Sequence, residues 1–285
     1  MSSARVWLIT GAASGVGRAT AELALSRGEK VLACVRRAAD LADLAYAPSQ
    51  LRTACVDVTR ADDVAGAFAA ALGAFGRVDV VLHSAAVALF GEVEGTPDDV
   101  ARGVFEVNFW GASHVARAAV RCFREQNPPG AGGRLLSVSS YAGIVPLGGC
   151  GYYSAAKAAL EAIHQSLAGE LDPEWNITVT IVILGTVRTP MADKATTLPP
   201  HPSYTDPHTP AAQGRKIIAA ARDPGMKHGD LSRTVERIYE VAGIANPPLR
   251  LVLGEDSLGV VRGHLSSVMK EVDDYASWST GLKEE

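Results

Sequence analysis

Residues 6–17, VWLITGAASGVG, decide the fold class of this chain. The apolar run at residues 6–9 predicts a short buried strand, and the glycines after it predict a tight turn. From Gly15 to Arg27, apolar and small residues follow helical spacing until Gly28 ends the pattern, which predicts a helix directly after the turn. A strand, a glycine-rich turn and a helix in this order indicate an α/β fold.

The rest of the chain repeats this alternation of short apolar runs and helical patterns. Seven strands are predicted at residues 6–9, 31–35, 51–56, 78–82, 134–138, 177–184 and 249–253. Helices are predicted at residues 15–27, 61–74, 97–126, 152–171, 231–241 and from about 257 onward. Strands that are apolar on both faces need helices on both sides. We therefore predict a doubly wound, Rossmann-like fold with a mostly parallel seven-stranded sheet and helices on both faces.

Length and composition limit the domain organisation and the partners. The chain has 285 residues, of which 47% are hydrophobic and 20% charged, with a net charge of −4. The length allows one or two domains, but the strand count favours a single domain over residues 1–285. No basic face indicates nucleic acid, no apolar run reaches the roughly 18 residues of a membrane span, and the N-terminal run turns polar too early for a signal peptide. We expect a cytoplasmic protein that binds neither nucleic acid nor membrane.

The cysteines do not indicate a metal site. Cys34, Cys55, Cys122 and Cys150 show neither CxxC spacing nor a histidine at ligand spacing. We expect buried or unreactive thiols, no disulfides in a reducing compartment and no metal.

Two segments do not belong to the alternation of strands and helices. Residues 190–228 contain seven of the fifteen prolines and follow the end of a predicted strand, so they are interpreted as a lid over a substrate site, with a disordered loop as the alternative. Residues 255–285 are interpreted as a C-terminal helical extension. A long lid suits a bulky apolar substrate.

The glycine turn has the properties of a nucleotide-binding loop. Gly11, Gly15 and Gly17 allow a sharp turn and a close approach of a pyrophosphate to the N-terminus of the following helix, where free N–H groups and the helix dipole favour negative charge. Ser14 and Val16 belong to the same turn. The spacing is G-x-x-x-G-x-G, and its position between a strand and a helix makes a cofactor site the preferred interpretation.

Tyr153 and Lys157 form a candidate acid–base pair. They are four residues apart on a predicted helix, so both side chains lie on one face. A nearby ammonium favours the phenolate and lowers the tyrosine pKa from its usual value near 10 towards neutral pH, as a general acid–base requires. Tyr152 is five residues from Lys157 and therefore lies on a different face of the predicted helix. The alternative is an ordinary amphipathic helix that carries a tyrosine and a lysine.

Ser140 ends the predicted strand that precedes this helix. A hydroxyl at the carboxyl end of a strand can donate a hydrogen bond to the oxygen of a substrate carbonyl and stabilise developing negative charge. Serines at strand ends also cap loops, so the two interpretations remain open for this residue alone.

Taken together, the turn at residues 10–17, Ser140 and the run YSAAK at residues 153–157 resemble the short-chain dehydrogenase/reductase family, in its shorter-chain branch. The resemblance covers about two thirds of the chain, as far as Thr189. It implies that Tyr153 exchanges a proton with a carbonyl or alcohol oxygen during hydride transfer to or from a nicotinamide, and that Lys157 lowers the tyrosine pKa and holds the nicotinamide ribose.

The resemblance implies further site residues. Asn108 matches the helix asparagine that holds a proton-relay water, and Asp57 matches the residue that contacts the adenine ring. Ala85 matches a close backbone contact after the fourth strand. Val187 and Thr189 match the positions that bind the nicotinamide carboxamide.

Two departures from the family pattern affect details. The family sequence Asn-Asn-Ala-Gly after the fourth strand is His83-Ser84-Ala85-Ala86 here, and we interpret His83 as a structural replacement rather than a catalytic base. The family sequence Pro-Gly after the sixth strand is Leu184-Gly185, which loosens that turn but keeps the groups that follow.

The end of the second strand predicts the cofactor. An acidic residue there would bind both ribose hydroxyls and repel a 2′-phosphate, but this chain has Arg36 and Arg37 instead. Arg36 can pair with a 2′-phosphate, with Ser14 adding a hydroxyl. We predict NADP(H) rather than NAD(H), and the alternative is that both arginines are solvated.

The sequence therefore predicts an NADP(H)-dependent oxidoreductase that acts on a ketone or secondary alcohol, with a bulky, apolar small molecule as substrate. A non-catalytic NADP(H)-sensing protein of the same fold and a non-redox lyase or isomerase that uses the same tyrosine are the alternatives. The long helices predicted at residues 97–126 and 152–171 resemble those that pair between subunits, so a homodimer or homotetramer is expected.

Overall fold

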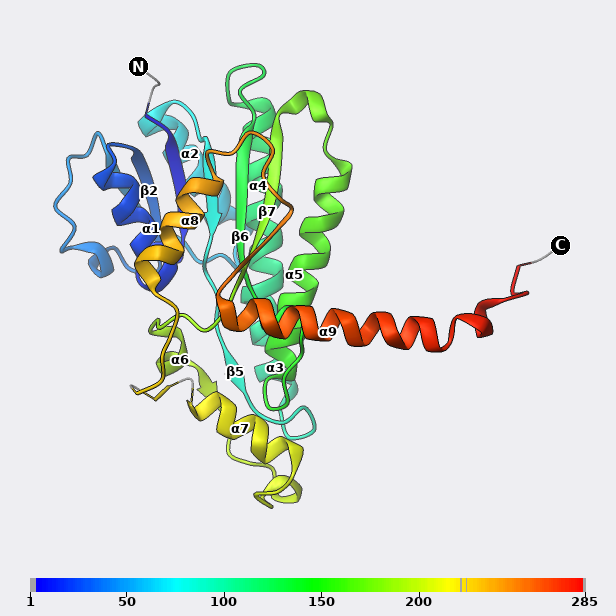
Figure 1. The fold of residues 1–285 in the computed structure, drawn as a ribbon. Helices are drawn as coiled ribbons and strands as arrows, with labels where there is room; N and C mark the ends of the chain where they lie inside the picture. Colours follow the sequence, from blue (N-terminus) through cyan, green and yellow to red (C-terminus); the bar gives the residue numbers. More distant parts are fainter. Residues whose placement is uncertain (1–3, 221, 224, 284–285) are drawn as a thin grey trace.

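The computed structural model describes residues 4–220, 222–223 and 225–283. Its centre is a sheet of seven strands in the order β3-β2-β1-β4-β6-β7-β9, in which every neighbouring pair is parallel (Figure 1). The strands are β1 (Val6–Thr10), β2 (Lys30–Val35), β3 (Leu51–Cys55), β4 (Val80–His83), β6 (Gly133–Ser140), β7 (Ile177–Leu184) and β9 (Arg250–Leu253). The predicted fold class is confirmed, and the predicted strand ends differ from the observed ones by one or two residues.

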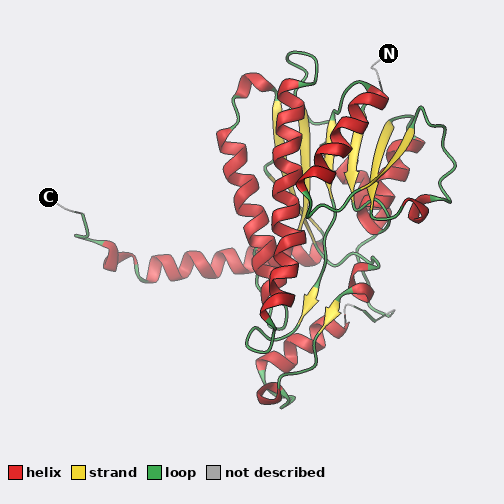
Figure 2. Ribbon diagram, turned by 180° about the vertical axis from the view of Figure 1, so that it is seen from behind, coloured by secondary structure: helices red, strands yellow, loops and turns green. Residues whose placement is uncertain are grey.

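Helices cover both faces of the sheet (Figure 2). One face packs against α1 (Gly15–Ser26) and α8 (Leu231–Val241). The other packs against α2 (Ala61–Phe75), α4 (Ala112–Glu125) and α5 (Gly151–Glu170). The strands in the middle of the sheet are buried on both sides, as in β1, whose five residues are all buried. This two-sided burial is why the strands are continuous apolar runs rather than alternating ones.

The long helix predicted at residues 97–126 consists of three consecutive helical segments. An α-helix, α3 (Asp98–Phe105), leads into a π-helical segment over Glu106–Gly111, and α4 follows without a break in the chain direction. Pro97 is the N-cap, and the hydroxyl of Thr96 donates a hydrogen bond to the Glu92 carbonyl instead of capping the helix. A π-helical turn adds one residue per turn and is often found at functional sites. Here it rotates Asn108 into the protein interior.

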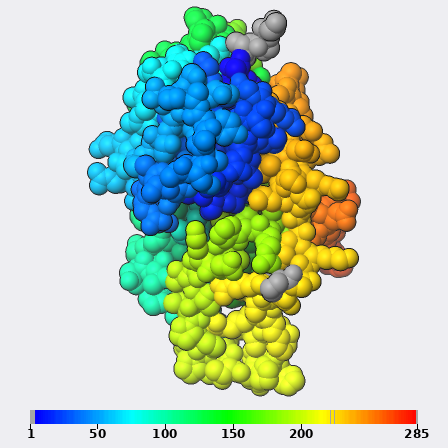
Figure 3. Space-filling view, turned by 90° about the vertical axis from the view of Figure 1, so that its left-hand side faces the viewer, coloured from blue at the N-terminus to red at the C-terminus, as the bar shows by residue number. Residues whose placement is uncertain are grey.

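The predicted lid contains regular structure that the proline-rich sequence did not indicate. It holds α6 (Met191–Lys194), β8 (Thr196–Thr197) and α7 (Pro210–Ala220), and β8 pairs in parallel with β5 (Leu89–Phe90) in a separate two-stranded sheet. In the space-filling view this yellow-green segment forms a lobe below the blue N-terminal part (Figure 3). Residues 221 and 224 of the predicted lid lie outside the described residues.

A partly buried ion pair attaches the lid to the body. Arg215 on α7 forms a two-pronged contact with the carboxylate of Glu92, which follows β5. The guanidinium lowers the pKa of Glu92 to about 2, because the charged carboxylate accepts hydrogen bonds from Arg215. Arg215 also donates to the Leu198 carbonyl at 3.0 Å. The lid is therefore fixed at a point away from the carboxyl ends of the main strands.

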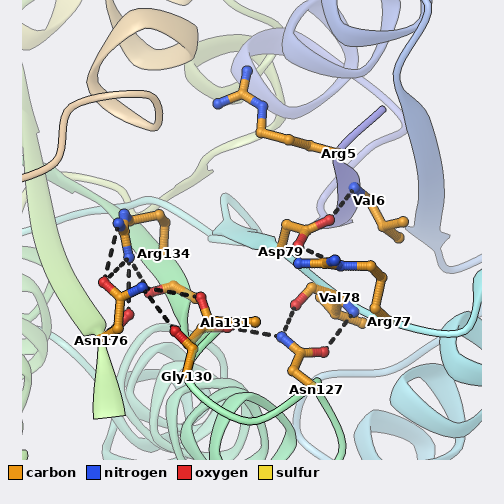
Figure 4. Close-up of polar contacts among 12 residues, drawn as sticks. Arg5, Val6, Arg77, Val78, Asp79, Asn127, Gly130, Ala131, Arg134 and Asn176 are labelled. Atoms are coloured by element: carbon orange, nitrogen blue, oxygen red, sulfur yellow. Dashed lines mark hydrogen bonds and ion pairs between the residues drawn. The ribbon is translucent and has the colours of Figure 1, made fainter. Parts of the chain in front are cut away.

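The amino ends of the strands are held together by side-chain amides (Figure 4). Asn127 accepts a hydrogen bond from the Val78 amide at 3.1 Å and donates to the carbonyls of Val78 and Gly132. Asn176, in the left-handed conformation at φ 52°, donates to two carbonyls in the loop before β6. These contacts align β4, β6 and β7 at the edge of the sheet opposite the predicted cofactor site.

The C-terminal helix α9 (Glu255–Asp274) starts two residues earlier than predicted and runs away from the body of the protein (Figure 1). Residues 284–285 of the predicted extension lie outside the described residues. Within the described part of the chain, no helix combines the length and the apolar composition that crossing a membrane would require.

Candidate active site

A cavity of about 620 Å³ lies at the carboxyl ends of β1, β2, β4, β6 and β7. Right-handed crossovers in a doubly wound sheet place ligands at this edge, where the strand order reverses between β1 and β4. Twelve of the fourteen residues predicted for the site line this cavity: Gly11, Ser14, Gly15, Val16, Arg36, Asp57, Ala85, Ser140, Tyr153, Lys157, Val187 and Thr189. The two that do not are Gly17 and Asn108, so tertiary structure brings most of the predicted set together.

The turn that contains Gly11, Gly15 and Gly17, which we call the cradle, packs too closely against neighbouring atoms to accept side chains. Gly11 has φ 67°, and a Cβ built on it would lie 2.8 Å from the amide nitrogen of Ala85. A Cβ on Gly17 would lie 2.5 Å from the carbonyl oxygen of Gly11, so Gly17 lets α1 pack against the turn without touching a ligand itself. The glycines therefore let the turn pack against neighbouring backbone, and the exposed backbone N–H groups at the N-terminus of α1 suit the pyrophosphate of a dinucleotide.

The Thr10 hydroxyl joins the first and fourth strands beneath this cradle. It accepts hydrogen bonds from the amides of Ser84 and Ala85, at 3.2 and 3.3 Å, and is 3.0 Å from Nδ1 of His83. The two amide donors occupy the acceptor sites of the hydroxyl oxygen, so its proton is free to be donated to Nδ1 of His83. Burial holds the pKa of His83 well below its usual value. These contacts support the structural role predicted for this residue.

Ser14 and Thr189 border the cradle on its open side. Ser14 is the N-cap of α1, but its hydroxyl makes no capping hydrogen bond, which leaves it available to a bound anion. The Thr189 side chain lies over the turn, since a Cβ on Gly15 would meet its Cβ at 3.2 Å. Val187 pairs with Gly229 in an isolated bridge, which ties this wall of the cavity to the end of the lid.

Arg36 and Arg37 differ in their surroundings. Arg37 is bound to Asp40, with its Nη2 at 2.8 Å from the carboxylate, and its side chain is 80% exposed. Both arginines line the cavity, but among the described residues no carboxylate forms an ion pair with Arg36. Its charge contributes to lowering the pKa of the nearby Asp57, although the hydrogen bonds from Thr59 are the main cause. Arg36 is therefore the arginine that can meet a ligand phosphate.

Tyr153 lies at the inner end of the cavity beside Ser140. Burial raises the pKa of Tyr153 to about 12, and the neighbouring Ser140 hydroxyl opposes this rise. The sequence predicted the opposite direction, because a lysine four residues away was expected to dominate. Desolvation of the phenolate is the larger effect in the folded protein. Tyr153 is thus a protonated phenol at neutral pH and is ready to donate a proton.

Lys157 is buried and bonded to the backbone. Its Nζ donates to the Val138 carbonyl at 2.9 Å and lies 5.9 Å from the centroid of the Tyr153 ring. Burial lowers the pKa of Lys157 to about 8, while the negative charge of Glu161 opposes the fall. The ammonium form therefore predominates at neutral pH and is lost as the pH rises through about 8.

Glu161 lies one turn after Lys157 on α5, and its negative charge favours the ammonium form of Lys157. It is 5% exposed, and its Oε1 accepts a hydrogen bond from the Ser139 hydroxyl at 2.6 Å. Nε of Arg250 lies 3.9 Å from Oε2. Sequence analysis did not identify Glu161, although its spacing of four from Lys157 is the signal that could have found it.

Replacing Glu161 by glutamine is expected to lower the pKa of Lys157 further. The ammonium would then be lost at lower pH, so the alkaline limb of the kcat/KM profile for carbonyl reduction moves to lower pH. At pH 8 the loss should be a few-fold, with little change at pH 6. The neighbouring His164 does not alter this, because burial lowers its pKa to about 4 and it stays neutral.

Glu170→Gln on the exposed end of the same helix is the matched control, because it removes the same charge far from Lys157. A Glu161→Gln profile that superimposes on the wild-type profile at every pH would show that the carboxylate does not tune the ammonium.

Asn108 lies behind the cavity and its amide is fully engaged. Its Oδ1 accepts from the Val87 amide at 2.9 Å, and its Nδ2 donates to the Val87 carbonyl at 2.8 Å. Both polar atoms of the side chain are therefore used to position Val87, which lines the cavity. A relay role through the Asn108 side chain stays a prediction that these contacts do not favour.

The lid contributes two residues that sequence analysis did not name. Met191 and Lys194 of α6 line the cavity. No sequence pattern marks them individually, and only the folding of the lid over the strand ends brings them there. No group of acidic, histidine or cysteine side chains suited to a metal ion occurs in the described residues.

Comparisons with known proteins agree with this geometry. The short chain dehydrogenase family model matches residues 5–198. An uncharacterized oxidoreductase of Schizosaccharomyces pombe is 34% identical over 276 residues, which cover 96% of this chain and 90% of that protein. The oxidoreductase calM of Penicillium decumbens is 30% identical over 286 residues, with 98% and 93% of the two chains covered.

Solved structures show the same fold. A short-chain dehydrogenase from Streptomyces avermitilis superimposes with a TM-score of 0.87 at 33% identity over all of both chains. A Burkholderia phymatum short chain dehydrogenase/reductase in complex with NAD reaches a TM-score of 0.77 at 22% identity, with 94% of this chain and 95% of that chain covered. The family match, the identities and the shared fold lead to one conclusion: this chain is an oxidoreductase and belongs to the short-chain dehydrogenase/reductase family.

Proposed function

We propose that the protein transfers a hydride between NADP(H) and a ketone or secondary alcohol, and that the substrate is bulky and apolar. The observation that carries this proposal is the meeting of Ser140, Tyr153 and Lys157 in the same cavity as the glycine cradle. A protein that only binds a dinucleotide has no physical need for a phenol and a buried ammonium next to the cradle.

The residues of the chain divide the chemistry of reduction between them. The nicotinamide, when bound, supplies the hydride that reaches the carbonyl carbon. Ser140 donates a hydrogen bond to the carbonyl oxygen and polarises it. Tyr153 transfers its phenolic proton to that oxygen as the C=O bond becomes C–O–H. The Lys157 ammonium stabilises the phenolate that remains until solvent returns the proton, and in the oxidation direction each transfer is reversed.

Arg36 supports the choice of NADP(H). A guanidinium can pair with a 2′-phosphate through two hydrogen bonds, and Arg36 lines the cavity beyond β2, with no ion-pair partner among the described residues. An acidic residue at this position would instead favour NAD(H). Among solved structures with the same fold, one is a Burkholderia cenocepacia short chain dehydrogenase in complex with NADP, at 21% identity.

The lining near Tyr153 supports an apolar substrate. Val87, Ala88, Leu184 and Met191 contribute side chains to the cavity. Such surfaces favour ligands that bury carbon rather than charge. Lys194 is the charged exception on the lid, and it lies on the exposed side of α6.

A panel of ketones of increasing size tests the proposal, with oxidation of NADPH and of NADH followed at 340 nm. We expect turnover that favours NADPH, with kcat/KM rising from small to bulky apolar ketones. The Ser140→Ala variant serves as a control, and its rate should fall with every active ketone. Binding of NADPH without turnover of any ketone or alcohol would favour the sensing alternative, and a preference for NADH would contradict the cofactor assignment.

A further inference from the structure

The C-terminal helix α9 packs against the body only at its base. Ser257 and Val261 are its buried residues, and every residue from Leu265 to Lys283 is exposed. Figures 1 and 2 both show the helix projecting from the sheet with its C-terminal end far from every other element. We call residues 258–283 the arm; no other element of the described chain covers its part from Leu265 to Lys283.

The arm carries apolar residues at alternating intervals of three and four. The series is Leu258, Val261, Leu265, Val268, Val272 and Tyr275. A repeat of seven residues with apolar first and fourth positions is the pattern by which two helices pack side by side over several turns. We call this series of residues the seam. The body of the protein covers the base of the seam at Val261, while the rest of the seam faces solvent. The repeat indicates that the covering partner is another helix.

The exposed apolar area of the arm is large, and it is contributed by α9 and by the residues that follow its end at Asp274. The exposed fractions are 51% for Leu265, 58% for Met269, 57% for Val272, 76% for Trp278 and 77% for Leu282. Together with Leu258, Val260, Val268 and Tyr275, they present on the order of 800 Å² of apolar surface, which is what one partner contributes to a standard interface. A contiguous apolar surface of this size marks an interaction site.

We propose that a second copy of this chain covers the seam, with the two arms packed antiparallel about a two-fold axis. A two-fold interface joins the same surface of both copies, and the seam is a single continuous stripe that can meet itself. In this arrangement Leu265 faces the partner subunit's Tyr275, and Val268 faces the partner subunit's Val272. The end of one arm, with Trp278 and Leu282, then reaches the exposed base of the other.

Charge favours the antiparallel direction. The first half of the arm carries Arg262, His264 and Lys270, and the second half carries Glu271, Asp273 and Asp274 with Lys283. Antiparallel packing places the basic half of one arm next to the acidic half of the other. Parallel packing would place the two acidic groups side by side.

The same charges disfavour a membrane as the partner. Helices that lie on lipid surfaces are rich in lysine and arginine beside their apolar face. Here the outer half of the arm is acidic, so an anionic lipid surface would repel it. The seam is also narrow and heptad-spaced, which suits a helix better than a flat surface.

The first experiment measures the mass of the full chain in solution by light scattering after size exclusion. The variant Leu265→Glu with Val272→Glu places two charges in the seam, and Ser266→Glu with Ser267→Glu adds the same charge on the exposed outer face. We expect the seam variant to have half the mass of the wild type and the control to keep the wild-type mass. Circular dichroism checks that both variants are folded.

A wild type with the 29.8 kDa of one chain would overturn the proposal, as would a seam variant that keeps the wild-type mass. Co-sedimentation of a monomeric wild type with vesicles of phosphatidylcholine and phosphatidylglycerol would assign the arm to a membrane instead. Ketone reduction is measured in parallel. A seam variant that dissociates but stays active would show that the arm interface is independent of the proposed function.

The second experiment determines the direction of the arms by oxidative cross-linking. The variants are Leu265→Cys, Tyr275→Cys and the two combined, with wild type as the control for the exposed Cys55. In antiparallel arms, position 265 of one copy faces position 275 of the other, so only the combined variant should form a disulfide-linked dimer. Cross-linking of either single variant with itself would show parallel arms and contradict the proposed geometry.

Discussion

Tyr153→Phe is expected to reduce kcat for ketone reduction by about 10²- to 10⁴-fold, the usual contribution of general acid catalysis. The phenolic proton is the one that the carbonyl oxygen receives, and phenylalanine keeps the ring but has no proton to give. Burial raises the pKa of Tyr153 to about 12, so the wild-type residue is fully protonated at neutral pH. The loss should therefore be the same at pH 6 and at pH 8.

Binding of NADPH should be nearly unchanged in this variant, as measured by fluorescence titration, because the cradle and Arg36 are untouched. Tyr152→Phe is the matched control, since Tyr152 packs with the apolar residues around Leu89 and does not line the cavity. Retention of wild-type turnover by Tyr153→Phe would mean that another group supplies the proton. Loss of NADPH binding together with turnover would mean that the tyrosine is needed for the shape of the site.

Arg36→Asp is expected to lower kcat/KM with NADPH by about 100-fold, because a charge-assisted hydrogen bond worth roughly 1.5–3 kcal/mol is lost and a repulsive charge is added. With NADH, the new carboxylate can accept hydrogen bonds from the ribose hydroxyls, so kcat/KM should stay level or rise. The measurement is the ratio of the two kcat/KM values, which is insensitive to the amount of active enzyme.

The neighbouring Arg37→Asp provides the comparison for this prediction. Arg37 is bound to Asp40 and is 80% exposed, so the same change of charge one residue away should leave the cofactor ratio close to that of the wild type. Equal weakening of NADPH and NADH by Arg36→Asp would contradict the 2′-phosphate role. An effect of Arg37→Asp as large as that of Arg36→Asp would indicate a general electrostatic effect instead.

Asn108 and Tyr153 show what the sequence did not indicate about the site. For Asn108, the relay role implied by the resemblance stays a prediction, and the structure adds that its side-chain amide exchanges two hydrogen bonds with the backbone of Val87. For Tyr153, the spacing to Lys157 suggested a lowered pKa, whereas burial raises it. Helical spacing reports which side chains share a face, but it carries no information about how much water reaches them.

The sequence by itself determined the features that depend on neighbours along the chain. Doubly buried strands must be continuous apolar runs, a phosphate cradle needs glycines within one turn, and an acid–base pair on a helix needs a spacing of four, so each leaves a local pattern. The parallel sheet, the glycine cradle and the pair Tyr153 and Lys157 could therefore be predicted.

Tertiary structure alone decided the features that depend on residues far apart in sequence. These are the burial of Tyr153 and Lys157, the contact of Glu161 with Ser139, the closing of Met191 over the cavity and the exposure of the arm beyond Val261. Desolvation and packing are set by everything that surrounds a side chain, and those surroundings exist only when the sheet, the lid and the C-terminal helix have been placed relative to one another.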